Sequence, residues 1–169
     1  MKRFEEFYVN GIKVLEQTYV DGTQEGLRIE WYKNGQKQEE VNYKNGKRDG
    51  IYTHWYMNGQ TWREGNWKEG NPNISVGSIR EGVWTIWHEN GQKKREVNYK
   101  NGKEDGFLTG WYENGQKKEE VNYKNGKPKG LHQEWHRNGQ KFVEGNYKYG
   151  KLITSIEWDE EGNVIRRNG

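Results

Sequence analysis

Residues 111–127 read WYENGQKKEEVNYKNGK, and variants of this stretch fill most of the 169-residue chain. The same pattern recurs from Trp31 to Lys47 and, with small changes, from Trp87 to Lys103. More diverged copies of the pattern begin at Trp55 and Trp135. Self-similarity at a fixed period predicts an array of stacked supersecondary units.

An aromatic ring opens each unit, and a second ring follows half-way through it. The steps between opening rings are 24 residues, except for one of 32 and a last one of 23. A turn pair, most often Asn-Gly, follows each ring within a few residues, and Asn-Gly is a strong hairpin signal because both residues tolerate positive φ. Turns at this spacing leave no room for helices. The opening rings are Phe7, Trp31, Trp55, Trp87, Trp111, Trp135 and Trp158.

These signals predict an all-β fold in one domain over residues 1–169. We expect an elongated single-layer antiparallel meander of about thirteen short strands, each of about five to seven residues, built from 24-residue hairpin repeats. The units begin near residues 7, 31, 55, 87, 111, 135 and 158. The one break is Asn71 to Arg80, an insertion that fits either a binding loop or a tolerated surface loop.

The parity of the residue numbers predicts which side chains share a face. Leu27, Trp31, Val41 and Tyr43 are all odd-numbered. A hairpin with an odd number of loop residues keeps the alternation in phase, so we expect odd loops throughout, with Lys33-Asn34-Gly35 as the first. This register predicts one aromatic and aliphatic face that carries both the Trp and the Tyr rings.

One carboxylate per unit recurs on the even-numbered face. We expect each to accept hydrogen bonds from the backbone or from Tyr and His, in preference to forming a catalytic or metal-binding row. No other residue set converges on chemistry, so the sequence predicts no enzyme, no cofactor, no metal site and no catalytic residue. The recurring carboxylates are Glu16, Glu40, Glu64, Glu96, Glu120 and Glu144.

Composition limits the remaining possibilities. Lys and Arg number 28 against 25 Asp and Glu, and this weak positive balance does not favour nucleic acid as a partner. The chain has no Cys, which excludes disulfides and thiolate chemistry. No run of 18 apolar residues predicts a membrane span. Cytoplasmic is the default location, although a leader removed upstream would leave no trace in this sequence.

The repeat unit resembles the bacterial MORN-repeat variant, which fills proteins labelled as antitoxins of YwqK-type toxin–antitoxin systems. The resemblance rests on the pattern Trp-Tyr-x-Asn-Gly-Gln-Lys followed by Tyr-Lys-Asn-Gly-Lys, and it extends from Phe7 to Gly162. It implies an elongated antiparallel sheet, a binding or scaffold role, and neutralisation of a toxic partner protein. The insertion at Asn71 to Arg80 and two His at the usual Tyr position, His88 and His136, depart from the pattern.

We therefore predict a non-enzymatic protein-binding repeat module, with a toxin or effector as the protein partner and an antitoxin or immunity role. The alternative is a scaffold that binds anionic membrane lipid or nucleic acid through interleaved Lys and aromatic side chains. The oligomeric state does not follow from the sequence. The expected partner-binding residues are Trp31, Trp55, Trp87, Trp111, Trp135, Asn73, Ile74, His88 and His136.

Overall fold

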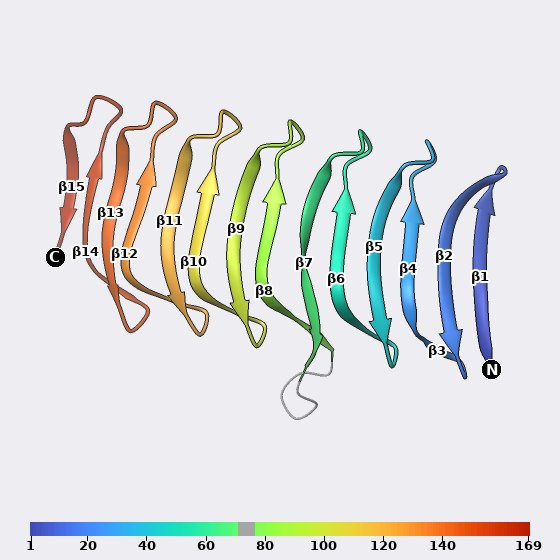
Figure 1. Cartoon of the computed structure of the whole chain (residues 1–169). Coiled ribbons are helices and arrows are strands. Elements are labelled where there is room, and N and C mark those ends of the chain that lie inside the picture. The colour runs from blue at the N-terminus through green and yellow to red at the C-terminus, as the bar shows by residue number, and fades with distance from the viewer. Residues whose placement is uncertain (71–76) are drawn as a thin grey trace.

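The computed structural model of the chain describes residues 1–70 and 77–169. These residues form a single open antiparallel sheet, drawn in Figure 1 with its strands side by side from the N-terminus to the C-terminus. The predicted all-β meander is confirmed. The strands are β1 (Lys2–Val9), β2 (Ile12–Val20), β3 (Thr23–Gln24), β4 (Gly26–Trp31), β5 (Lys37–Lys44), β6 (Lys47–Trp55), β7 (Thr61–Glu69), β8 (Ser78–Trp87), β9 (Lys93–Lys100), β10 (Lys103–Trp111), β11 (Lys117–Lys124), β12 (Lys127–Trp135), β13 (Lys141–Lys148), β14 (Lys151–Trp158) and β15 (Val164–Asn168).

The strands are more numerous and mostly longer than predicted. Strand order follows chain order, except that the two-residue β3 pairs with β2 beside the main path. The two unpredicted strands are β3, which Glu25 separates from β4, and β15, which follows the last turn. Strands such as β6 contain nine residues because the lysines that flank the Asn-Gly turns stay in the ladder. Residues 78–80, predicted as part of the inserted loop, belong to β8.

The β1–β2 turn at the upper edge of Figure 1 has two residues, Asn10 and Gly11, and the later upper turns have the predicted three-residue loops. In the first of these loops, the Gly35 N–H donates to the Tyr32 carbonyl over 2.9 Å, and the Tyr32 N–H donates to the Gln36 carbonyl over 2.8 Å. Gly35 has a φ of 83°, the left-handed conformation that glycine adopts without a steric penalty. The loop Lys33-Asn34-Gly35 is therefore confirmed.

The turns at the lower edge are different, and there the prediction of odd loops is wrong. Lys44 pairs directly with Lys47, so only Asn45 and Gly46 lie outside the ladder. Both have positive φ, 51° and 73°, which defines a type I′ turn whose twist matches that of the flanking strands. The same pair of conformations occurs at Asp21-Gly22, Asn101-Gly102, Asn125-Gly126 and Tyr149-Gly150.

A β-bulge beside each three-residue upper turn places the Trp and Tyr rings on opposite faces. Trp31 pairs with Lys37, but Glu30 pairs with Glu39, so Gln38 is an extra residue in β5. Beyond the bulge, even-numbered residues of β4 pair with odd-numbered residues of β5, as Arg28 does with Val41. The expected single face that joins Trp31 to Val41 and Tyr43 is therefore wrong, because a bulge shifts the alternation without changing the loop length. We call the face with Val41 the core face and the face with Trp31 the striped face.

The core is one row of side chains that crosses the strands on the core face. Val41 pairs with Tyr52, Trp84 with Val97, and Leu108 with both Val97 and Val121. All six are buried, although the sheet has a single layer. Neighbouring rings pack against the row and cover it, and these are Tyr43, Trp67, Tyr99 and Tyr123.

Candidate functional site

The striped face carries an exposed apolar side chain once in every unit from β4 to β12. Ile51 is 75% exposed and Phe107 is 63% exposed. Strand alternation puts each of them on the same face as the Trp that ends its strand, four residues later. The apolar positions are two strands apart, about 10 Å, and so form a line across the sheet. Their members are Leu27, Ile51, Val83, Phe107 and Leu131.

These side chains are exposed because their cross-strand neighbours are short and polar. Ile51 pairs with Asn66, and Phe107 pairs with Asn122. Asn42, the neighbour of Leu27, bonds the strand on its other side, because its Nδ2 donates to the Asp49 carbonyl of β6 over 2.9 Å. Such a neighbour does not cover the apolar group, so the line is free for contact.

On the striped face, strands that carry an exposed apolar residue alternate with strands that carry a lysine–glutamate pair. We call each such pair a charged column. Lys93 Nζ lies 2.6 Å from Glu96 Oε2, and the equivalent distance from Lys117 to Glu120 is 2.7 Å. The recurring carboxylates therefore accept mainly from a lysine three residues earlier, and not from the expected backbone, Tyr or His donors. Glu64 is the exception, because Thr61 occupies that lysine position. The remaining pairs are Lys13–Glu16, Lys37–Glu40 and Lys141–Glu144.

The predicted Trp residues lie on this face, half-buried under the same lysines. The ammonium of Lys37 lies 5.7 Å from the centre of the Trp55 ring in the next unit, a cation–π distance. Trp31, Trp111 and Trp135 are covered in the same way by Lys13, Lys93 and Lys117. For Trp87 the equivalent position is Thr61.

The two predicted His residues take the place of Tyr in a ladder along the upper edge. Tyr32 Oη donates to the carbonyl of Trp55 over 2.8 Å. His88 Nε2 lies 3.0 Å from the Trp111 carbonyl and His136 Nε2 2.9 Å from the Trp158 carbonyl. A carbonyl only accepts, so each Nε2 carries the proton. His88 and His136 thus hold consecutive units together. The predicted residues Asn73 and Ile74 lie outside the described residues.

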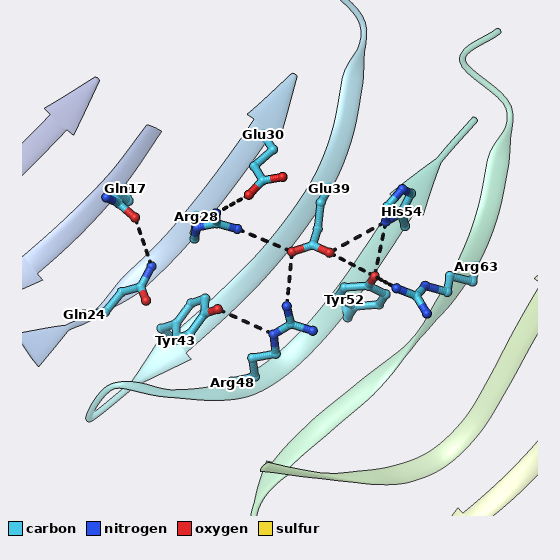
Figure 2. A network of polar contacts seen from close by, with 10 residues as sticks. All are labelled: Gln17, Gln24, Arg28, Glu30, Glu39, Tyr43, Arg48, Tyr52, His54 and Arg63. Carbon is cyan, nitrogen blue, oxygen red and sulfur yellow. Dashed lines mark hydrogen bonds and ion pairs between the residues drawn. The ribbon is translucent and has the colours of Figure 1, made fainter. Parts of the chain in front are cut away.

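Sequence reasoning missed a polar network on the core face, drawn in Figure 2. Its centre is Glu39, which is only 8% exposed. Glu39 accepts from Tyr52 Oη over 3.0 Å and lies 3.4 Å from the guanidinium groups of both Arg28 and Arg48. Arg63 donates to Tyr52 Oη over 2.6 Å. The available signal was Tyr52 itself, a polar aromatic residue at a core position where later units have Leu108 or His132.

Burial changes the titration of two members of this network. It raises the pKa of Tyr52 to about 12, with the Glu39 charge adding to the effect and Arg63 opposing it. Burial and the Arg63 charge lower the pKa of His54 below its ordinary value of 6.5, against the attraction of Glu39. Both groups are therefore neutral near pH 7, inside an otherwise charged cluster.

The profile of the MORN repeat variant matches the chain five times, over residues 24–45, 48–69, 80–101, 105–125 and 128–149. These segments cover more than half of the sequence. The chain belongs to the MORN repeat variant family. No curated protein matches it.

Each MORN repeat variant match is one hairpin closed by an upper turn. Residues 48–69 contain most of β6 and all of β7, and residues 105–125 contain most of β10 and all of β11. The chain is thus a repeat module, and type I′ turns at Asn45-Gly46, Asn101-Gly102 and Asn125-Gly126 join successive MORN hairpins. Residues 1–70 and 77–169 contain no apolar helix of the length that a membrane span requires. In the same ranges, no three His, Asp or Glu side chains gather as a metal-binding group.

The lowered pKa of His54 predicts that mild acid weakens this MORN sheet. Below about pH 6.5 the unfolded chain binds a proton that folded His54 does not, so the His54 contribution to stability is full above pH 6.5 and is lost as the pH falls through the folded pKa. We expect the free energy of unfolding, measured by urea titration, to fall less between pH 7 and pH 5 in His54→Gln than in the parent. An equal fall in both proteins would contradict this assignment.

Proposed function

We propose that this chain is a non-enzymatic protein-binding module whose contact surface is the striped face. The observation that carries the proposal is the line of exposed apolar side chains, one per unit, from Leu27 to Leu131. Exposed apolar side chains that repeat along one face and are rimmed by polar residues are typical of protein interaction sites. The half-buried Trp31, Trp55, Trp87, Trp111 and Trp135 lie beside this line and extend the proposed contact set.

Charge supports a protein partner over an anionic polymer on this face. Binding to nucleic acid or anionic lipid needs cations that are free to neutralise phosphates. Here Lys37, Lys93 and Lys117 each lie against a glutamate of their own strand, so these columns are close to neutral. Exposed apolar side chains that alternate with neutral lysine–glutamate pairs match the mixed apolar and polar composition of protein interfaces.

The partner that we propose is a toxin or effector, which the sheet neutralises by covering its surface. This step rests on the resemblance to antitoxin-labelled bacterial proteins. Co-expression tests it directly: the toxicity of a bound partner should be suppressed by the parent chain and return with striped-face variants.

The alternative function, a scaffold for anionic lipid or nucleic acid, draws on other lysines. Lys44, Lys47, Lys124 and Lys127 flank the lower turns, away from the glutamate columns. This alternative predicts liposome or RNA binding at low ionic strength that falls steeply with added salt. Blank liposome flotation and gel-shift experiments at low salt would eliminate it.

Replacing two exposed residues tests the contact surface. We expect Ile51→Ser and Phe107→Ser each to weaken partner binding by about tenfold or more, because a buried Ile or Phe contributes about 1.5–3 kcal/mol to an interface. Neither residue supports the core, so stability should hardly change. Affinity is measured by calorimetry with the partner recovered by pull-down from the native host.

Met57→Ser is the matched control, since Met57 is 61% exposed but lies at the tip of an upper turn. Its affinity should equal that of the parent. Unchanged affinity in both folded striped-face variants would overturn the assignment of this face.

A further inference from the structure

The residue type at one position on the core face differs from unit to unit. Its side chain decides whether the space between neighbouring rings at the lower edge is occupied. It is the residue that pairs with the second ring of each unit, as Arg48 does with Tyr43 and Pro128 with Tyr123. Going along the chain, this position is occupied by Gln24, Arg48, Arg80, Glu104, Pro128 and Leu152.

An arginine at this position lies against the rings on either side. The Arg48 guanidinium is 5.6 Å from the centre of the Trp67 ring and 3.5 Å from Tyr43 Oη. Arg80 lies 6.0 Å from the Trp67 ring centre and donates to Tyr99 Oη over 2.9 Å. In these units a planar cation occupies the space between neighbouring rings.

Pro128 is too short to do the same beside Tyr147, and a hollow of about 890 Å³ opens there. A volume of this order is typical of small-molecule sites. Pro128, Tyr147 and Tyr149 supply its apolar surface. The other lining residues are Lys103, Lys124, Asn125, Lys127, Lys129, Gly130, Lys148 and Gly150.

The charged residues that line this hollow are all positive. Five lysines line it, and the lining contains no Asp or Glu. Lys124 forms an ion pair with Asp105 at 3.1 Å. Among the described residues, no carboxylate forms an ion pair with Lys103, Lys127, Lys129 or Lys148. Because the whole chain has a net charge of only +3, this is a strong local concentration of positive charge.

We propose that the hollow binds a phosphate ester that carries a flat ring, such as a nucleoside phosphate or an aryl phosphate. The ring takes the place that arginine has in the earlier units and packs against Tyr147 and Pro128. The phosphate is held by the surrounding lysines, whose mutual repulsion it relieves. The hollow lies at the lower edge of the sheet and includes none of the exposed apolar residues from Leu27 to Leu131, so it is separate from the striped-face contact surface proposed above.

Calorimetric titration of the full chain with four probes tests the two halves of the ligand. ADP and phenyl phosphate carry both a ring and phosphate, pyrophosphate carries no ring, and adenosine carries no charge. We expect ADP or phenyl phosphate to bind about tenfold tighter than pyrophosphate and adenosine, which is the order expected for stacking on an aromatic side chain. Ring-bearing probes that bind no tighter than pyrophosphate would overturn the proposal.

Pro128→Arg separates a shaped site from simple charge attraction. It restores the arginine found at position 48 and adds a positive charge, so charge attraction alone predicts tighter binding. Filling of the hollow predicts about tenfold weaker binding of the ring-bearing probe. Tighter or unchanged binding would contradict the proposal.

Substitutions of two equivalent lysines at the lower edge of the sheet, one inside and one outside the lining of the hollow, test whether the site is local. Lys127→Gln removes a lysine of the hollow and should weaken binding, whereas Lys151→Gln removes the equivalent lysine of the next unit, outside the lining, and should not. Equal losses in both would show a diffuse charge effect and overturn the site. Far-UV circular dichroism melts check that all three variants stay folded.

Discussion

Gly65→Ala is expected to destabilise the protein by about 3 kcal/mol, the upper end of the usual cost of overpacking. Gly65 pairs with Tyr52, and the Trp84 ring lies directly over it. A Cβ at this position would be 2.2 Å from the Trp84 ring. The indole would have to leave its stack with Tyr52, whose ring centre is 5.6 Å away, and lose the bond from Nε1 to the Asn66 carbonyl. Urea unfolding followed by circular dichroism measures the loss.

Gly145→Ala is the matched control for that substitution. Gly145 lies on the same core row, but its added Cβ would meet the end of the Leu152 side chain at 2.9 Å, and Leu152 is exposed and free to turn away. We expect a change within about 1 kcal/mol. In a Trp84→Leu background the cost of Gly65→Ala should shrink, since the two sites are in contact. An undiminished cost would show that the ring is not its cause.

Glu39→Gln is expected to cost about 2–3 kcal/mol at pH 7, measured as the free energy of unfolding in urea. The substitution keeps the shape of the side chain but removes the buried negative charge that faces Arg28 and Arg48. It also replaces one of the two acceptor oxygens with an NH2 group, which cannot accept from Tyr52 Oη. Arg28 keeps its ion pair with Glu30, but Arg48 loses the carboxylate that offsets its burial.

The comparison for this variant is Glu120→Gln on the striped face. Glu120 is held by Lys117 at 2.7 Å, but both side chains are more than 30% exposed. Solvent screens such a pair, so its loss should change stability by less than about 1 kcal/mol. Equal effects of the two substitutions would contradict a special role for the buried network.

The architecture could be predicted because it depends on local chemistry that recurs. Asn-Gly pairs such as Asn45-Gly46 favour tight turns wherever they stand, and the rings between them need a half-buried strand. The three-residue loop at Lys33-Asn34-Gly35 followed from the same reasoning. The lower turns were misjudged because Asn34-Gly35 and Asn45-Gly46 are the same dipeptide, yet only in the second does Asn have positive φ.

Face assignment was less predictable, because it depends on the pairing of two strands. The extra residue Gln38 shifts every following side chain to the other face, and no residue type in the stretch marks it. The Trp residues of the expected contact set nevertheless lie beside the line of exposed apolar side chains. Leu27 and Trp31 are on one strand, so they share a face whatever the register of the neighbouring strand. Val41 and Tyr43 lie on the face opposite to Trp31, and residue parity alone does not predict this.

The site features depend even more on neighbouring units. His88 and His136 stood out in the sequence as departures, yet each bonds the next unit's backbone as Tyr32 does. Pro128 did not stand out, because its effect is visible only beside Tyr147 of the following strand. A single repeat carries no information about the space between two repeats.

The sequence by itself determined the repeat, the turn positions and the single-layer antiparallel sheet, because turn preference and strand preference act within a few residues. Only the tertiary structure decided the register. The bulge at Gln38 separates the Trp rings from the Val41 row and places Glu39 beside Arg28 and Arg48. The pairing of β12 with β11 and β13 leaves the hollow beside Pro128. These features arise from which residues lie opposite one another on adjacent strands, and that is fixed by hydrogen bonding across the whole sheet.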